Sequence, residues 1–258
     1  MILNRVTCSG PNEFTNIHDL LELMSTFPLG EVAIQVSDRQ SPAGGPRLEW
    51  IKALAAIVSE QKKHFTAALH VNEKWVEEIC RGNVVPELKE LLELNNYYRE
   101  PLFNRLQLNF KIGRNEVPAP EECAKNLRLV QKRIHRPFIL SCNESNAALI
   151  KKNYLGGLFF ECLYDSSFGQ GIEPDKRRPP LFYDTKQGYA GGIKPDNVYT
   201  TLNAVLEAVN AAPQFVTEVF IDAQKGLEDD AGHFSISKGY AYLATASVWY
   251  KQHRMLQN

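Results

Sequence analysis

The sequence predicts a single domain over residues 1–258, folded as a closed α/β barrel of the (β/α)8 (TIM barrel) class. Short apolar runs typical of strands alternate with segments of helical spacing, which favours parallel strands joined by crossover helices. Eight such units in 258 residues match the usual size of this barrel, with an open, doubly wound sheet as the alternative. The eight expected strands cover residues 3–8, 31–36, 65–71, 105–110, 137–142, 155–163, 188–193 and 217–222.

The segments between these strands carry apolar residues at the spacing of amphipathic helices. They cover residues 17–27, 48–60, 73–94, 121–134, 144–152, 196–211 and 235–255. Residues 164–185 break the alternation, since they hold glycines, prolines and a charged run but no helical pattern. A loop of this length after a strand is usually functional, and residues 81–101 read as added helix and turn.

The composition narrows the possible partners. A formal net charge of -1 leaves no basic surplus for a nucleic acid backbone, so no nucleic acid partner is expected. No apolar run approaches membrane-spanning length and no signal peptide is evident, so we expect a cytoplasmic protein without a membrane partner. The five cysteines lack CxxC spacing and are expected to be free thiols.

In a barrel, residues just past each strand converge on one mouth, where chemistry is placed. The polar residues and glycines at these positions are therefore the candidates for a functional site. They are Cys8, Arg47, Asn72, Asn109, Asn143, Asp165, Gly191, Gly192, Asp222 and Gly226.

The run Gly188-Tyr189-Ala190-Gly191-Gly192-Ile193-Lys194-Pro195-Asp196-Asn197-Val198 joins a strand, a glycine pair and a helix start. Glycines let a ligand approach the main chain, and their amides can point at an oxyanion near the helix dipole. A tight turn is the alternative interpretation. Gly226, after the last strand, lies where barrels commonly bind phosphate, and this favours the anion site.

These residues resemble the phosphoribosylanthranilate isomerase family, a (β/α)8 barrel of tryptophan biosynthesis. The similar segments run through the whole chain in the family's order. They are Val6-Thr7-Cys8-Ser9-Gly10, Gly45-Pro46-Arg47, Ala67-Ala68-Leu69-His70-Val71-Asn72, Asp165 with Gly169-Gln170-Gly171, Gly191-Gly192-Ile193-Lys194-Pro195-Asp196-Asn197-Val198, and Ile221-Asp222-Ala223-Gln224-Lys225-Gly226-Leu227-Glu228.

The resemblance implies an Amadori rearrangement of N-(5-phosphoribosyl)anthranilate by acid and base catalysis, without metal or cofactor. Asp165 would be the acid that opens the furanose, and Cys8 the base that takes the C2′ proton as a thiolate. Each residue has a plainer interpretation: Cys8 as a small buried hydrophobe and Asp165 as a turn residue. The catalytic interpretation requires both side chains to face the cavity.

The resemblance also implies that Arg47 pairs with the anthranilate carboxylate, although Arg47 could simply cover the surface beside Trp50. Asn109 stands where the family usually has a histidine motif, and Asp222 matches a family aspartate near the sugar. We expect these three residues to bind the substrate. Gly191, Gly192, Lys225 and Gly226 would hold the phosphate.

The sequence differs from the family at two places, namely Asn109 and the replacement of small hydroxyl residues by Gln224-Lys225. These differences leave the identity of the substrate undetermined. The leading hypothesis is the isomerase, acting on a small sugar phosphate. The alternatives are a phosphosugar-binding barrel without catalysis, and an isomerase or lyase of the same superfamily with another substrate. No dinucleotide fingerprint suggests a flavin or nicotinamide cofactor.

Overall fold

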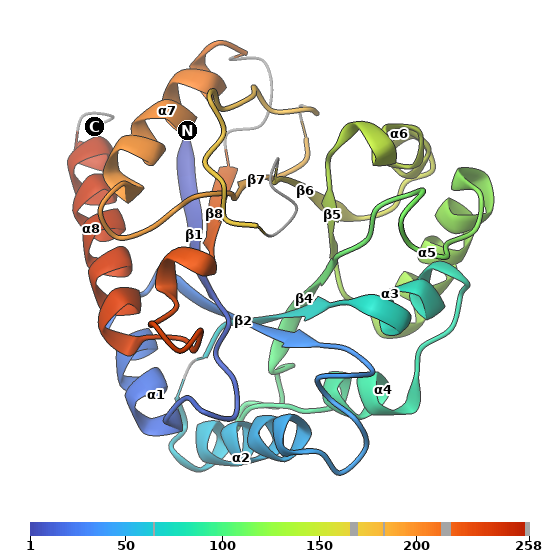
Figure 1. Cartoon of the computed structure of the whole chain (residues 1–258), viewed down its shortest axis with the longest axis horizontal. Helices are drawn as coiled ribbons and strands as arrows, with labels where there is room; N and C mark the ends of the chain where they lie inside the picture. Colours follow the sequence, from blue (N-terminus) through green and yellow to red (C-terminus); the bar gives the residue numbers. More distant parts are fainter. Residues whose placement is uncertain (64, 166–169, 183, 213–217, 256–258) are drawn as a thin grey trace. The chain divides into compact units, whose positions relative to one another are not determined.

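Eight parallel strands pair in chain order and close into a barrel in the computed structural model (Figure 1). The structure describes residues 1–63, 65–165, 170–182, 184–212 and 218–255. The predicted barrel is confirmed, and each predicted strand has a counterpart. The strands are β1 (Ile2–Ser9), β2 (Gly30–Val36), β3 (Ala67–Val71), β4 (Phe103–Leu108), β5 (Phe138–Ser141), β6 (Phe160–Tyr164), β7 (Gln187–Tyr189) and β8 (Glu218–Ala223). Thr217, the expected start of the last strand, lies outside the described residues.

The helices follow the predicted segments with one difference. The segment expected as one helix over residues 73–94 forms two, because Gly82 adopts a φ of 94° and Pro86 starts a new helix at its first turn. The α-helices are α1 (Ile17–Thr26), α2 (Pro46–Glu60), α3 (Glu73–Cys80), α4 (Pro86–Leu92), α5 (Pro120–Ile134), α6 (Ala147–Leu155), α7 (Val198–Asn210) and α8 (Ile236–Met255). Two short 3-10 helices are η1 (Glu144–Asn146) and η2 (Lys225–Leu227). None of the described helices is long and apolar enough to cross a lipid bilayer.

Four strands are shorter than predicted: β3 and β5 by two residues each, and β6 and β7 because of a glycine pair. Strand β7 ends at Tyr189 because Gly191 and Gly192 adopt positive φ angles of 84° and 66°, which extended backbone does not allow. Residues 155–159, expected as strand, instead end α6 and turn through Gly156-Gly157. The glycine pair after β7 is therefore a turn, as well as a candidate anion site.

The barrel is divided into two compact units. One unit holds residues 1–33 and 162–258, and the other holds residues 34–161. In the first unit β8 pairs with β1 and with β7, and α7 packs against α8 (Figure 1). In the second unit β3, β4 and β5 pair in order, and α5 packs against α3 and α6. A single domain over the whole chain stays a prediction.

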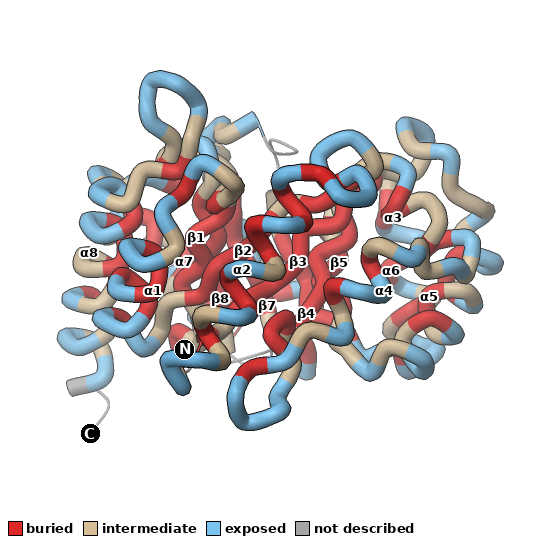
Figure 2. Tube along the Cα trace, turned by 90° about the horizontal axis from the view of Figure 1, so that it is seen from below, coloured by how far each residue is buried: buried red, intermediate tan, exposed pale blue. Residues whose placement is uncertain are grey.

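The strands are almost entirely buried, whereas the helices turn exposed residues outward (Figure 2). Several of the buried strand residues are charged, and these are paired. Arg105 of β4 forms an ion pair and hydrogen bond with Glu161 of β6, and both side chains are nearly inaccessible. Buried charges are tolerated only in such pairs, because an isolated one loses its hydration without compensation.

The buried Arg105–Glu161 pair leads to a stability prediction. Glu161→Gln removes the Glu161 charge from the buried ion pair with Arg105, so we expect the free energy of unfolding to fall by about 3–5 kcal/mol. Chemical denaturation monitored by circular dichroism measures this loss. The control is Glu93→Gln, which removes an exposed partner of Lys89 at 3.9 Å and should cost less than about 0.5 kcal/mol. Equal losses in the two variants would contradict the prediction.

Candidate active site

Hydrogen bonds on β1 fix which residues share a face of the strand. The Thr7 hydroxyl donates to Glu31 Oε2 over 2.9 Å, and the Ser9 hydroxyl donates to Asp222 Oδ1. Successive side chains of a strand point to opposite faces. Thr7 and Ser9 therefore lie on the inner face with these carboxylates, and Cys8 between them faces the helix layer.

The surroundings of Cys8 agree with this orientation. Its side chain is fully buried. Val6, two residues earlier, pairs with Gly30, and a Cβ added at Gly30 would lie 3.2 Å from Met24 of α1 and 3.6 Å from Leu243 of α8. Val6 and Cys8 therefore both face the helices. Burial raises the pKa of the Cys8 thiol far above its usual range, and the negative charge of Asp222 raises it further. Both effects keep Cys8 protonated at neutral pH, whereas the expected base must be a thiolate.

Asp222 lies near the end of β8 and is 8% exposed. In the strand register it stands beside Thr7, one residue before the position level with Cys8. The hydrogen bond from Ser9 orients its carboxylate at the mouth side of the strand. Cys8 and Ser9 are the last two residues of β1, and it is Ser9 that forms a hydrogen bond with Asp222.

Asp165 follows β6 and shares the inner face with Asp222. A Cβ added at Gly188 would lie 2.2 Å from the ring of Phe220 and 2.8 Å from Leu163, so these side chains point to the same side. Asp165 and Asp222 stand two residues beyond Leu163 and Phe220, respectively, and alternation returns them to that side. Asp165 is half-buried.

The two aspartates also hold equivalent positions in the strand register. Tyr164, Tyr189 and Ile221 are partners in the β6–β7–β8 register, and the aspartates are the next residues of β6 and β8. Two strand spacings separate their backbones, or about 10 Å. Their side chains project to the same side from backbones at this separation.

Arg177 of the long loop lies beside this region and is 6% exposed. Its guanidinium donates to the carbonyls of Ala190 over 2.6 Å and Gly191 over 3.1 Å. Burial lowers its pKa, while the negative charges of Glu173 and Asp165 act in the opposite direction. Arg177 therefore ties the loop to the end of β7 and places a positive charge near Asp165.

The expected phosphate loops present unused backbone donors. In the part of the chain that the structure describes, the amides of Gly191, Gly192, Lys225 and Gly226 donate no hydrogen bond. Amides of this kind, converging at two loops, form a site for an oxyanion. Gly226 has no room for a side chain, because an added Cβ would lie 2.3 Å from the Ile193 carbonyl oxygen.

The loop after β6 lies directly against the glycine turn. A Cβ added at Gly192 would lie 2.4 Å from the main chain of Glu173, and Asn197 donates both to the Glu173 carboxylate and to the Gly192 carbonyl. Gly169 of the expected glycine-rich loop lies outside the described residues. The acidic Glu173 thus stands at the edge of the expected anion site.

The candidates of residues 34–161 form contacts of their own. Arg47 begins α2, is 8% exposed and donates to the Gln35 carbonyl over 2.9 Å. Asn109 donates to the Asn72 side chain over 2.9 Å and accepts from Gln107 over the same distance. The predicted amides at the ends of β3 and β4 therefore meet, and Arg47 is buried rather than spread on the surface.

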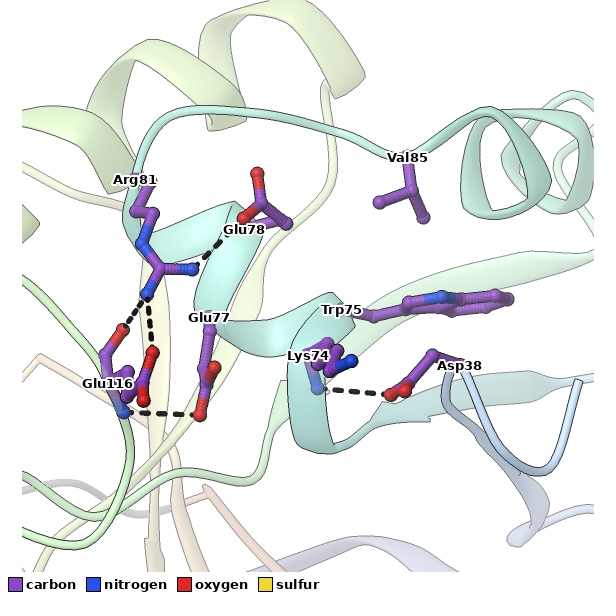
Figure 3. A pocket seen from close by; sticks show the side chains of 8 residues that line it. All are labelled: Asp38, Lys74, Trp75, Glu77, Glu78, Arg81, Val85 and Glu116. Atoms are coloured by element: carbon purple, nitrogen blue, oxygen red, sulfur yellow. Dashed lines mark hydrogen bonds and ion pairs between the residues drawn. The ribbon is translucent and has the colours of Figure 1, made fainter. Parts of the chain in front are cut away.

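A separate groove of about 380 Å³ runs along α3 in the same unit (Figure 3). Arg81 reaches between Glu78, at 2.9 Å, and Glu116, at 3.6 Å, while Asp38 accepts from the Lys74 amide. Its acidic residues thus have partners within the groove. It holds none of the residues predicted for catalysis or phosphate binding.

Metal chemistry has no evident place among the described residues. No group of three or more histidine, cysteine, aspartate or glutamate side chains lies close enough together to hold a metal ion. All five cysteines are buried, and none forms a disulfide. Asp165 and Asp222 are side chains able to transfer a proton, and the glycine loops carry amides able to bind an anion.

Comparison with known proteins gives no sequence match, since neither a family profile nor a curated protein resembles the chain closely enough. Solved structures do match. Phosphoribosylanthranilate isomerase from Thermus thermophilus superposes with a TM-score of 0.52 and 18% identity, over 95% of this chain and 98% of that one.

Two further structures support the same fold. TrpF from Jonesia denitrificans matches with a TM-score of 0.51 and 15% identity, covering 94% of this chain and 96% of its own. A DAHP synthase, phospho-2-dehydro-3-deoxyheptonate aldolase, from Thermotoga maritima matches with a TM-score of 0.53 and 11% identity, over 98% and 70%. The chain thus has the (β/α)8 fold of phosphoribosylanthranilate isomerases, a fold that an aldolase shares.

Proposed function

We propose that this protein is an isomerase of a sugar phosphate, acting by the Amadori rearrangement on N-(5-phosphoribosyl)anthranilate. The observation that carries the proposal is the set of unused amides at Gly191, Gly192, Lys225 and Gly226. They cap the same end of the strands as two inward-facing carboxylates. The likeness to solved phosphoribosylanthranilate isomerases supports this choice among the reactions that the fold hosts.

Asp165 is the proposed acid. It would protonate the ring oxygen of the furanose while the nitrogen lone pair opens the ring to an iminium ion. The position of Asp165 on the inner face, in register with Asp222, supports this role. Arg177 nearby would compensate for the negative charge that the loss of the proton leaves on Asp165.

A second candidate is a barrel that binds a phosphosugar without converting it. Two observations favour it: Cys8 faces the helix layer, and Glu173 packs against the proposed anion site. A relative with another substrate is a third candidate, because the Arg47 guanidinium already contacts the Gln35 carbonyl. The three candidates differ in what the purified protein does with the same substrate.

Turnover of phosphoribosylanthranilate tests the proposal directly. We expect the wild-type protein to consume this fluorescent substrate, and Asp165→Asn to lower kcat by about 10²–10⁴-fold because the acid is lost. The control is Asp184→Asn, an exposed aspartate on the same loop. Binding of substrate without loss of fluorescence in the wild type would favour the non-catalytic candidate instead.

The phosphate site is tested with inorganic phosphate. Gly192→Ala places a methyl group against the main chain of Glu173 and strains a residue of positive φ, so we expect phosphate affinity to fall at least about tenfold by calorimetry. Gly232→Ala is the matched control, since its φ is 81° but open space surrounds it. Equal affinities in both variants would place the anion site elsewhere.

A further inference from the structure

The pairing of Ser9 with Asp222 points to a base that differs from the thiolate. We propose that the Asp222 carboxylate is the general base of this barrel, that Ser9 positions it, and that Cys8 takes no part in proton transfer. This inference rests on the proposed function, because it assigns the base of that same reaction. It follows from which face of each strand these three side chains occupy.

Cys8 lies on the wrong side of β1 for contact with a substrate. The hydrogen bonds of Thr7 and Ser9 place both neighbours on one face, and the pairing of Val6 with Gly30, which lies against helices α1 and α8, places Cys8 on the opposite, helix-facing side. Rotating it inward would shift β1 by one residue and break both hydrogen bonds. The thiol is therefore part of the packing between the barrel and α8.

Asp222 has the position that a base requires. It lies on the inner face, at the register position equivalent to Asp165, and two strand spacings of about 10 Å separate the backbones of β6 and β8. A furanose between them would present its ring oxygen to one carboxylate and C2′ to the other. The neighbouring loop after β8 holds two of the phosphate-binding amides, so one strand end would contribute to both parts of the site.

The proton transfers balance without an oxidant or a metal. Asp165 gives its proton to the ring oxygen, the C1′–O bond breaks, and the nitrogen lone pair forms the C1′=N bond. Asp222 then removes the C2′ proton, and that electron pair forms C1′=C2′ as the C=N pair returns to nitrogen. The enolamine gains a proton at C1′ and loses one from the 2′-hydroxyl to give the ketone. Exchange with solvent restores the two aspartates.

Ser9 is a positioning residue in this scheme. A carboxylate offers about four lone-pair directions, so the bond from the Ser9 hydroxyl fixes its orientation without exhausting its capacity to accept a proton. Without this bond the carboxylate could rotate, and the proton transfer would lose the alignment that it needs. The loss should slow the chemical step rather than substrate binding.

Thiol alkylation checks the orientation of Cys8 separately from turnover. Burial and the charge of Asp222 both raise the pKa of the thiol, so the reactive thiolate is scarce at pH 8. We expect iodoacetamide to leave Cys8 unlabelled in the native protein after labelling of the same cysteine is complete in denaturant, as read by peptide mass spectrometry. Rapid native labelling of Cys8 would place it at an open mouth and overturn the inference.

The decisive experiment compares four variants with the wild type on phosphoribosylanthranilate. We expect Asp222→Asn to lower kcat more than about 10³-fold with KM within about threefold, and Cys8→Ala to keep kcat within about tenfold. Ser9→Ala should lower kcat about 10–100-fold and raise the isotope effect of C2′-deuterated substrate, and Ser9→Thr should restore most of the rate.

The outcomes separate this inference from the proposed function. A wild-type protein that converts the substrate, together with an active Asp222→Asn or an inactive but folded Cys8→Ala, overturns the inference alone. A wild-type protein without turnover overturns both proposals. Folding of each variant is checked by circular dichroism and by calorimetric binding of inorganic phosphate, which a loss of proton transfer alone would leave unchanged.

Discussion

The two-residue repeat of β1 is the constraint on which the candidate site depends. Thr7 and Ser9 each bond a carboxylate on the inner face, and a change of register by one residue would break both bonds. Cys8 is consequently packed between strand and helix layer, where its thiol is shielded from water. The orientation of one strand thereby decides which side chain can reach a substrate.

Paired charges allow the inner wall to be both polar and rigid. Glu31 accepts from Thr7 and forms an ion pair with Arg5 at 3.5 Å, and Arg105 pairs with Glu161 in the other unit. Such networks hold their members in one arrangement when every charge is compensated. Side chains on the strands near the mouth of the barrel then keep a fixed orientation, which proton transfer requires.

The strands and helices were predictable because they depend on local patterns. The same holds for the turn at Gly191 and Gly192, since only glycine tolerates their backbone angles. The side of β1 on which Cys8 lies was also predictable, because Arg5, Thr7 and Ser9 alternate with apolar neighbours. The resemblance to the family drew attention to the cysteine instead. Arg177 and Tyr242 could not be found this way, because a loop and a distant helix bring them to the site only in the folded chain.

The closeness of Cys8 and Asp222 limits the chemistry further. The Asp222 charge raises the cost of ionising the thiol, so a thiolate and a carboxylate would oppose each other in a place with little water. Only one of them can serve as the anionic base. Asp222 reaches the inner face and is bonded by Ser9, whereas Cys8 is enclosed near a tyrosine. The free-energy cost of a second buried anion, rather than the type of residue at the end of β1, therefore favours the carboxylate as the proposed base.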